Sequence, residues 1–463
     1  MNHKSDKTTV LIVVILGCFM SPFMISSINI ALPQIGNEFS MGAVSLGWVV
    51  TSYTLASVTF VVPFGRIADI KGRKKIFAWG MIVFTITSIL MTVVNSGIML
   101  IVFRFLQGVG GAMAISASVA ILTSVFPAGE RGKALGLYTA SVYLGLSLGP
   151  FLGGLLTQNF GWRSIFIVCI PIGLAVIALI FWKLKEDWAE AQGEKFDIVG
   201  SAIYIVALII MVYGFTVLTT TLGVILTSVG IVGLILFIFW ETRVASPVLD
   251  LSLFRRNKAF SFSCLAALIN YGATWGVVFL ISLYLQYTKG LSPQDAGFIL
   301  VSQPLVQFIF SPIAGRISDR VQPRIVASAG MAFTTIGLLL FIFLDKDTSM
   351  LFIIVSLVLI GFGLALFSSP NTNAAMSSVS NKVYGIASAS ISTARLLGMI
   401  VSMVIVMLLL AFYLGSAQIT PEYYGAFSQV IQVAFIVFAV LCFGGIFASL
   451  VRGNLQEPKR DLS

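Results

Sequence analysis

The chain lacks most of the side chains on which catalytic and metal chemistry depends. It has a single histidine, His3, before the first apolar segment, and four cysteines that each lie alone in an apolar run. Such a set does not build a metal cluster or a disulfide framework, so the sequence predicts neither a metal nor a cofactor. Charge is scarce too, at 10% of residues, where a soluble domain carries roughly a quarter. With 58% hydrophobic residues and a mean hydropathy of +1.01, the composition indicates a multispanning membrane protein.

Apolar runs of about 20 residues, long enough to cross a bilayer as helices, occur fourteen times in the chain. They lie at roughly 9–34, 45–64, 76–94, 98–123, 134–157, 164–182, 198–217, 221–240, 261–285, 295–314, 325–344, 351–370, 384–411 and 428–451. The sequence therefore predicts an all-α membrane protein with fourteen transmembrane helices.

The distribution of positive charge predicts which ends of these helices face the cytoplasm. Of the 28 lysines and arginines, 23 lie in the tails and in the loops on one side, and three, Arg163, Lys289 and Lys346, lie on the other. Because cytoplasmic loops carry the excess of positive charge, we expect both termini in the cytoplasm and the protein in the cell membrane. The net charge of +10 is spread over short loops, so we expect no nucleic-acid partner.

A short charged segment, GRIADIKGRKK at Gly65–Lys75, separates the second and third apolar runs and is interpreted as a turn. The sequence nearly repeats it 250 positions later, as GRISDR at Gly315–Arg320. Two related halves of this kind are typical of secondary transporters. We expect both segments to act as gates between the halves, through Gly65, Asp69, Gly72 and Arg73 in the first and Gly315, Asp319 and Arg320 in the second.

The first of these segments resembles a signature of the major facilitator superfamily. Six residues match its motif G-x-L-A-D-R-x-G-R-K in order and spacing: Gly65, Ala68, Asp69, Gly72, Arg73 and Lys74. The chain departs from this motif at Ile67, where the family has leucine, and at Ile70, where it usually has arginine. The resemblance implies two six-helix bundles around a central cavity, which alternate access by rocking against each other.

A glycine pattern in the fifth apolar run resembles the G-x-x-x-G-P-x-x-G-G motif of the antiporters in this superfamily. It consists of Gly145, Gly149, Pro150, Gly153 and Gly154. Glycines at spacing four form a smooth helix face that allows close contact with another helix, and proline favours a bend. The resemblance implies antiport; the alternative is a packing and hinge element with no bearing on the direction of transport.

Two further features resemble the fourteen-span drug:proton antiporter branch of the superfamily. The spans at 198–217 and 221–240 have no counterpart in a twelve-span repeat, and Asn29–Pro33 has the pattern N-x-A-L-P. The resemblance implies an N-terminal bundle at 1–182, a linker with two additional helices at 183–260 and a C-terminal bundle at 261–463. Met24 stands nine positions before the proline, where that branch usually has an acid.

Polar side chains within the apolar runs are candidates for the cavity and for coupling. Arg104 and Gln107 are three residues apart, share a helix face, and belong to a segment that resembles the family motif R-x-x-Q-G-x-G-A. Arg104 either faces a cavity or a polar partner, or it extends outward over the ~9 Å to the membrane surface. Arg395 lies ~16 Å inside its span and is expected to face the cavity. The full candidate set is Asn29, Arg104, Gln107, Asn270, Gln303, Gln307 and Arg395.

The function expected from the resemblance is proton-coupled efflux of small amphipathic molecules, by a monomer in a lipid bilayer. All eighteen acids lie in loops or at span ends, so no carboxylate is placed at mid-membrane to carry a proton or to bind a cationic drug. The proton would then be taken up near a span end, with Asp69, Asp295, Asp319 or Glu38 as candidates, or by the substrate itself.

Three alternatives remain open. The buried arginines and the missing acid favour an exporter or flippase of an anionic or neutral metabolite or lipid. A membrane-embedded enzyme would need paired carboxylates, histidines or a metal cluster near the membrane face, and the sequence offers none, so we expect no enzyme. A sensor that has lost transport is compatible with the same residues.

Overall fold

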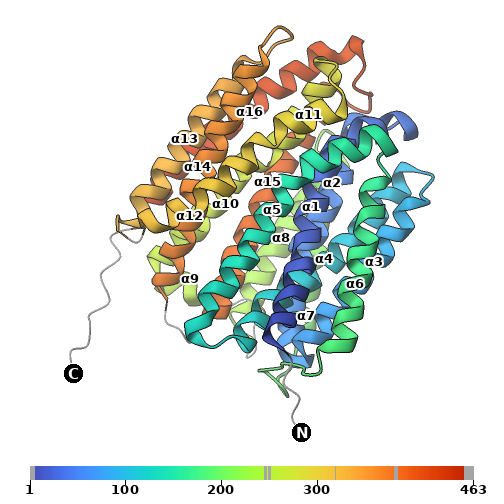
Figure 1. Ribbon diagram of the computed structural model, residues 1–463. Coiled ribbons are helices and arrows are strands. Elements are labelled where there is room, and N and C mark those ends of the chain that lie inside the picture. The colour runs from blue at the N-terminus through green and yellow to red at the C-terminus, as the bar shows by residue number, and fades with distance from the viewer. Residues whose placement is uncertain (1–5, 245–247, 249–251, 319, 380–383, 453–463) are drawn as a thin grey trace.

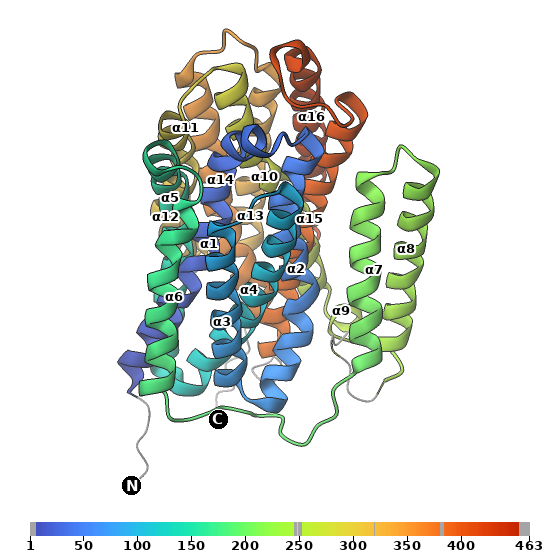
Figure 2. The same cartoon turned by 90° about the vertical axis from the view of Figure 1, so that its right-hand side faces the viewer.

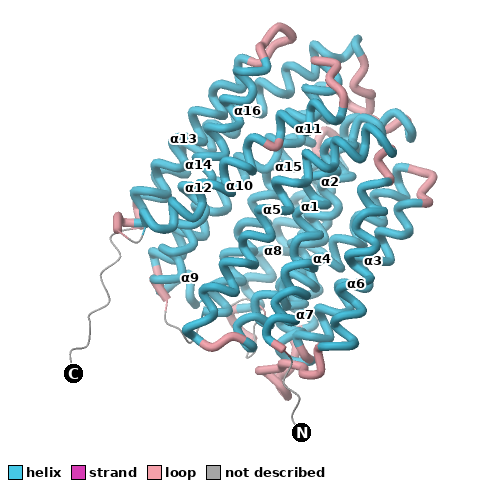
Figure 3. The backbone as a smooth tube through the Cα atoms, viewed as in Figure 1, coloured by secondary structure: helices cyan, strands magenta, loops and turns pink. Residues whose placement is uncertain are grey.

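The computed structural model describes residues 6–244, 248, 252–318, 320–379 and 384–452. Within these ranges the chain is helical and contains no strand (Figures 1 and 3). Fourteen segments are long and apolar enough to cross a membrane. The predicted all-α membrane fold with fourteen spans is therefore confirmed. His3 and Asp319 lie outside the described residues.

The helices follow the chain in three groups. The first group comprises α1 (Lys7–Phe39), α2 (Ala43–Lys71), α3 (Arg73–Thr92), α4 (Gly97–Val125), α5 (Ala128–Phe160) and α6 (Ser164–Lys183). The second comprises α7 (Ile198–Thr216) and α8 (Thr221–Glu241). The third comprises α9 (Ser252–Arg256), α10 (Lys258–Leu283), α11 (Pro293–Leu300), α12 (Ser302–Ser318), α13 (Pro323–Leu340), α14 (Met350–Ser377), α15 (Tyr384–Tyr413) and α16 (Tyr424–Leu450).

Short polar side chains fix where many of these helices begin. Each accepts a hydrogen bond from a backbone N–H of the first turn, which would otherwise lack a partner inside the helix. These caps are Asp6, Ser96, Asp197, Thr220, Asn257, Ser292 and Ser349. These helices thus begin where the chain supplies a polar side chain as a cap.

The charged segment at 65–75 differs from its prediction as a turn. Helix α2 continues through it to Lys71, and α3 begins at Arg73, so Gly72 alone separates the two helices. Gly72 has φ of 116°, a backbone conformation that side-chain-bearing residues rarely adopt. One glycine therefore reverses the chain, and Asp69 and Arg73 lie on helices.

The predicted helix at 295–314 is a second difference. The structure divides this span at Val301 into α11 and α12. Pro304 has no N–H, so the carbonyl of the residue four positions earlier loses its helical donor near this break. The preceding span is also irregular at its end, because residues Tyr284–Thr288 form a π-helical turn after α10.

Helices α1–α6 pack mainly against one another, and α10–α16 do the same. We call these two groups the first half and the second half. The halves meet through contacts of α1 with α10, α2 with α15, and α5 with α11 and α12. The α7–α8 pair stands beside this body, and α7 contacts α2 and α15 (Figure 2).

The two halves are joined at one end of the bundle. We call the end that bears Lys7, Lys71 and Lys183 the basic end and the other the opposite end. At the opposite end hydrogen bonds cross between the halves, among them Ser282 Oγ to Asn29 O at 2.7 Å, Gln286 Nε2 to Ile30 O at 3.1 Å, and Ala43 N to Ala417 O at 3.0 Å. None of the described hydrogen bonds or ion pairs joins the halves at the basic end. The structure is therefore closed at the opposite end.

Candidate functional site

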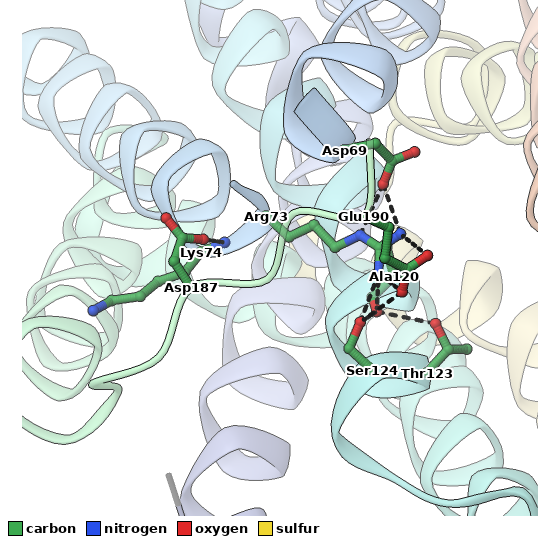
Figure 4. Close-up of polar contacts among 8 residues, drawn as sticks. All are labelled: Asp69, Arg73, Lys74, Ala120, Thr123, Ser124, Asp187 and Glu190. Carbon is green, nitrogen blue, oxygen red and sulfur yellow. Dashed lines mark hydrogen bonds and ion pairs between the residues drawn. The ribbon is translucent and has the colours of Figure 1, made fainter. Parts of the chain in front are cut away.

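The guanidinium of Arg73, at the start of α3, binds two carboxylates at the basic end (Figure 4). Its Nε donates to Asp69 Oδ1 at 2.8 Å. Its Nη1 and Nη2 donate to the two oxygens of Glu190 at 2.7 and 3.0 Å, and Nη1 also donates to Ser124 Oγ at 2.6 Å. A bidentate arginine–carboxylate pair of this kind combines charge with fixed geometry.

Glu190 belongs to the segment between α6 and α7, residues 184–197, which we call the strap. Backbone hydrogen bonds hold the strap against the charged segment: Arg73 N donates to Trp188 O at 2.8 Å, and Ala191 N donates to Asp69 O at 3.0 Å. Asp187 accepts from the backbone N–H of Lys74 at 3.1 Å, in the first turn of α3. The strap thus covers the junction between α2 and α3.

This arrangement keeps Arg73 within the first half and the strap. The hydrogen bonds from Arg73 hold the pKa of the Glu190 carboxyl below its ordinary value, so Glu190 is ionised at neutral pH. Gly72 leaves room for the strap, because an added Cβ would lie 2.3 Å from Asp187 Oδ2. Neither Asp69 nor Arg73 makes a described hydrogen bond or ion pair with the second half.

The related segment in the second half is less connected. Gly315 lies on α12, where an added Cβ would lie 3.1 Å from Ser369 Oγ of α14. Arg320 is exposed and forms none of the described ion pairs, and Asp319 lies outside the described residues. Only the first of the two predicted gates therefore has a described charge network.

Arg104 is fully enclosed inside the first half. Its Nε donates to Val49 O at 3.1 Å and its Nη1 to Gln107 Oε1 at 2.6 Å. Gln107 Nε2 in turn donates to Ser88 Oγ at 2.9 Å, and the guanidinium lies 4.6 Å from the ring centre of Tyr53. Arg104 is 0% exposed and links α2, α3 and α4, so it does not extend outward to the membrane surface.

Arg395 has different surroundings. It is half-buried on α15, where its Nη2 donates to Thr372 Oγ1 of α14 and its guanidinium lies 5.8 Å from the ring centre of Tyr271. Its Nε has no hydrogen-bond partner among the described residues. Tyr143 of the first half lies at the same seam, with its hydroxyl 3.1 Å from Ser368 Oγ. Arg395 therefore lies where the two halves meet.

The four remaining polar candidates are buried. Asn29 donates to Ile25 O at 3.0 Å, and its own backbone carbonyl accepts the bond from Ser282 of the second half. Asn270 is 0% exposed, and neither atom of its amide has a described hydrogen-bond partner. Gln303 and Gln307 are both on α12, and the carbonyl of Gln303 packs against Gly361 of α14. These side chains do not form one cluster with Arg104.

The glycine pattern allows α5 to pack against α1 within the first half and against α11 of the second half. On one side an added Cβ at Gly149 would lie 1.7 Å from Ser26 Oγ of α1. On the other, an added Cβ at Gly154 would lie 2.5 Å from Pro293 O, and one at Gly297 of α11 would lie 2.3 Å from Pro150 O. Gly145 and Gly153 also face α1, through Phe19 O and Ser27 Cα at 2.8 and 2.9 Å. Helix α5 therefore packs closely against α1 of its own half and against α11 of the second half.

Asp69, Glu38 and Asp295, the described acids among the candidates for proton uptake, all accept hydrogen bonds. Glu38 accepts from Arg163 Nη2 at 2.6 Å and from Trp162 Nε1 at 2.6 Å, at the opposite end. Asp295 accepts from Ser292 Oγ at 2.7 Å, at the start of α11. Met24, at the position of the family's helix-1 acid, is 0% exposed.

The sequence analysis missed three groups that the structure brings to these sites. The sequence analysis places Glu190 only within the linker at 183–260, although the match between acids in that linker and the basic segment at 65–75 was a usable signal. Tyr143 and Ser368 are neutral and gave no signal. Arg452, just past α16, is buried and donates to Asn371 Oδ1 at 2.6 Å. Arg452 follows the last span, where basic residues are common, so its sequence position gave no sign of a buried role.

Comparison with known proteins gives one result for the family. The family model described as Major Facilitator Superfamily matches residues 14–249 and 263–462. Riboflavin transporter RibZ of Clostridioides difficile (strain 630) is 33% identical over 393 residues, which cover 84% of this chain and 85% of the relative. Multidrug resistance protein Stp of Mycobacterium tuberculosis (strain ATCC 25618 / H37Rv) is 33% identical over 416 residues, covering 88% and 76%.

Among solved structures, a crystal structure of the peptide transporter POT in complex with alafosfalin has a similar fold. The TM-score is 0.69, and the match covers 95% of this chain and 93% of that chain. The sequence identity is 15%, so this likeness concerns the fold alone.

Proposed function

The chain belongs to the major facilitator superfamily, and from that premise we propose that it exports small amphipathic molecules across the cell membrane by alternating access. The observation that carries the proposal is that hydrogen bonds join the halves at the opposite end and none of those described joins them at the basic end, with Arg395 half-buried at the seam between them. A seam closed at one end is what one state of an alternating-access cycle requires. The names of two relatives, a riboflavin transporter and a multidrug resistance protein, support a small-molecule substrate.

The basic end faces the cytoplasm in this proposal. The excess of lysine and arginine in the loops of that end supports the assignment, through the positive-inside rule. Reporter fusions at Ser96, Lys346 and Tyr424 are expected to report the outside, and fusions at Lys74, Glu190 and Arg320 the inside. A terminus that reports the outside would contradict the orientation.

The proton gradient drives export in this proposal, although no described mid-membrane residue is a carboxylate. Support comes from the glycine and proline pattern on α5, which joins α1 of the first half to α11 of the second. Asp69 is a span-end acid beside the junction of α2 and α3, and it shares Arg73 with Glu190. The proton is therefore exchanged at a span end or carried by the substrate.

A second candidate function is export of an anionic or neutral metabolite or lipid. It is favoured by Arg104 and Arg395, the two cations within the spans, and by Met24 at the position of the family's helix-1 acid. The two functions share alternating access and differ in the charge of what they carry.

Transport in reconstituted vesicles tests the proposed function. Purified protein is placed in liposomes with an imposed pH gradient, and a panel of cationic, neutral and anionic fluorescent dyes is followed as each dye crosses the membrane. We expect at least one dye to move against its own gradient while protons move the other way, and an ionophore that dissipates the gradient to stop it. If no dye in the panel moves under any gradient, the export proposal is wrong.

A further inference from the structure

A group of aromatic and hydroxyl side chains surrounds Arg395 at mid-membrane. Tyr271 of α10 and Thr372 of α14 contact its guanidinium. Ser368 of α14 links the two halves, since its hydroxyl lies 3.4 Å from that of Tyr271 and 3.1 Å from that of Tyr143 on α5.

Arg395 makes fewer described hydrogen bonds than the other buried arginines. Arg73 binds two carboxylates, Arg104 is enclosed by Val49, Gln107 and Tyr53, and Arg452 donates to Asn371 and Ser449. Arg395 makes one described side-chain hydrogen bond, to Thr372. Like Arg104, it forms none of the described ion pairs and has one buried guanidinium nitrogen without a described partner, but Arg104 is fully enclosed whereas Arg395 is half-buried at the seam.

Because Arg395 lies deep in its span, a charge without a carboxylate partner is energetically costly there. Eleven helical residues separate it from the start of α15 at Tyr384, hence ~16 Å in a hydrocarbon core about 30 Å thick. A charge at that depth is normally paired or faces a polar path. Arg395 is also half-buried rather than enclosed, so a molecule entering the seam can reach it.

The surroundings select the chemistry of that molecule. A guanidinium binds carboxylate, sulfonate or phosphate oxygens through paired N–H donors, and it keeps its charge. Tyrosine rings stack on flat aromatic surfaces, and their hydroxyl groups accept or donate hydrogen bonds. Because the tyrosines come from both halves, one ligand can contact both at once.

We propose that Arg395, with Tyr143 and Tyr271, forms a recognition site for an anionic aromatic molecule, with the anion on Arg395 and the ring system between the tyrosines. This inference rests on the proposed export function, for which it names the substrate class. The ligand replaces the carboxylate that Arg395 lacks, and it occupies the seam that must rearrange when the halves move.

Two dyes with the same xanthene ring and opposite charge test the site: anionic fluorescein and cationic rhodamine 123. Binding to the full-length protein in lipid nanodiscs is followed by fluorescence anisotropy, without transport. We expect fluorescein to bind at least about tenfold more tightly than rhodamine 123, since a desolvated charge pair contributes that much or more. Arg395→Gln is expected to remove this preference, and Arg395→Lys to keep part of it.

The same binding assay tests the role of the tyrosine ring, and a cation elsewhere in the chain provides the control for Arg395. Tyr271→Phe keeps the ring and is expected to bind fluorescein nearly as well, whereas Tyr271→Leu is expected to weaken it several-fold. Lys346→Gln removes an exposed cation at the opposite end and is expected to change nothing. If Arg395→Gln does not fold, Arg395→Lys and the dye preference of the unmodified protein decide the matter.

The outcomes separate this inference from the export proposal. Equal affinity for both dyes, or fluorescein binding that Arg395→Gln leaves unchanged, overturns the site whatever the vesicles show. Fluorescein binding that depends on Arg395 supports the site even when no dye crosses the vesicle membrane, and in that case the export proposal alone fails.

Discussion

Replacing Glu190 by glutamine removes the charge of the strap from Arg73 and keeps the size of the side chain. Arg73 would retain Asp69, Ser124 and the backbone contacts of the strap. A contact changes the balance between two conformations only if it differs between them. Closing the basic end is expected to bring the second half against Arg73 and to displace Glu190, so Glu190→Gln should disfavour the arrangement described here.

The solvent exposure of Glu190 limits how much its ion pair with Arg73 contributes to the balance between the two conformations. A hydrogen bond to a charged group contributes about 1.5–3 kcal/mol, and a solvent-exposed ion pair about 0.2–1 kcal/mol. The side chain of Arg73 is 7% exposed, but that of Glu190 is 68% exposed. We therefore expect a loss of about 1 kcal/mol, which is roughly a fivefold change in the ratio of the two conformations.

Spin labels at the basic end measure that ratio. Cysteines introduced at Lys133 on α5 and at Gln322 beside α13 are exposed, whereas the four native cysteines are buried. The distance distribution in nanodiscs should shift toward the shorter distance in Glu190→Gln, and Glu422→Gln at the opposite end is the control. High salt should reduce the difference because Glu190 is exposed.

The pH dependence of this contact follows from the lowered pKa of Glu190. The contact contributes fully above the ordinary pKa of a glutamate and is lost as the pH falls through the lowered value. The spin-label distances should therefore be constant around neutral pH and shift only in acid. A distribution that is identical in wild type and Glu190→Gln at low salt would refute the reasoning.

Three further variants test other parts of the structure. Gly154→Ala places a Cβ 2.5 Å from Pro293 O and is expected to open the opposite end and slow transport. The control is Gly136→Ala on the same helix, whose added Cβ meets nothing within 4 Å. Equal transport rates in the two variants would contradict this expectation. Asp69→Asn is expected to slow vesicle transport while dye affinity stays within a few-fold, and a wild-type rate would remove Asp69 from the gate. Arg104→Lys replaces the two guanidinium nitrogens that donate to Val49 O and Gln107 by a single ammonium nitrogen, and it should lower the free energy of unfolding by about 1–3 kcal/mol. An unchanged midpoint of thermal unfolding would show that these bonds do not stabilise the fold.

Hydropathy and motif spacing were sufficient to predict the spans, because a helix that crosses lipid must be apolar over a fixed length. The break at Gly72 was harder to predict. The charges of 65–75 suggested a solvated turn, but a single residue with positive φ is enough to reverse the chain, and the charged residues remain helical.

The partners of the charged residues could not be predicted in the same way. Arg73 and Glu190 are 117 positions apart, and no local pattern connects them. Arg104 and Arg395 looked alike as arginines within apolar runs, yet one is enclosed by its own half and the other lies at the seam. Only the packing of helices distant in the sequence separates a structural arginine from one that can meet a ligand.

The position of α7 makes the two sides of the molecule unequal toward the lipid. Tyr204 of α7 donates to Val58 O of α2 at 3.1 Å, and the same helix packs on Ile400 and Val404 of α15, so it covers the line where α2 meets α15. Along the line where α5 meets α11 and α12, Leu155, Phe298 and Leu305 are exposed. The surrounding bilayer thus meets a helix pair from the middle of the chain on one flank and the apolar side chains of the two halves themselves on the other.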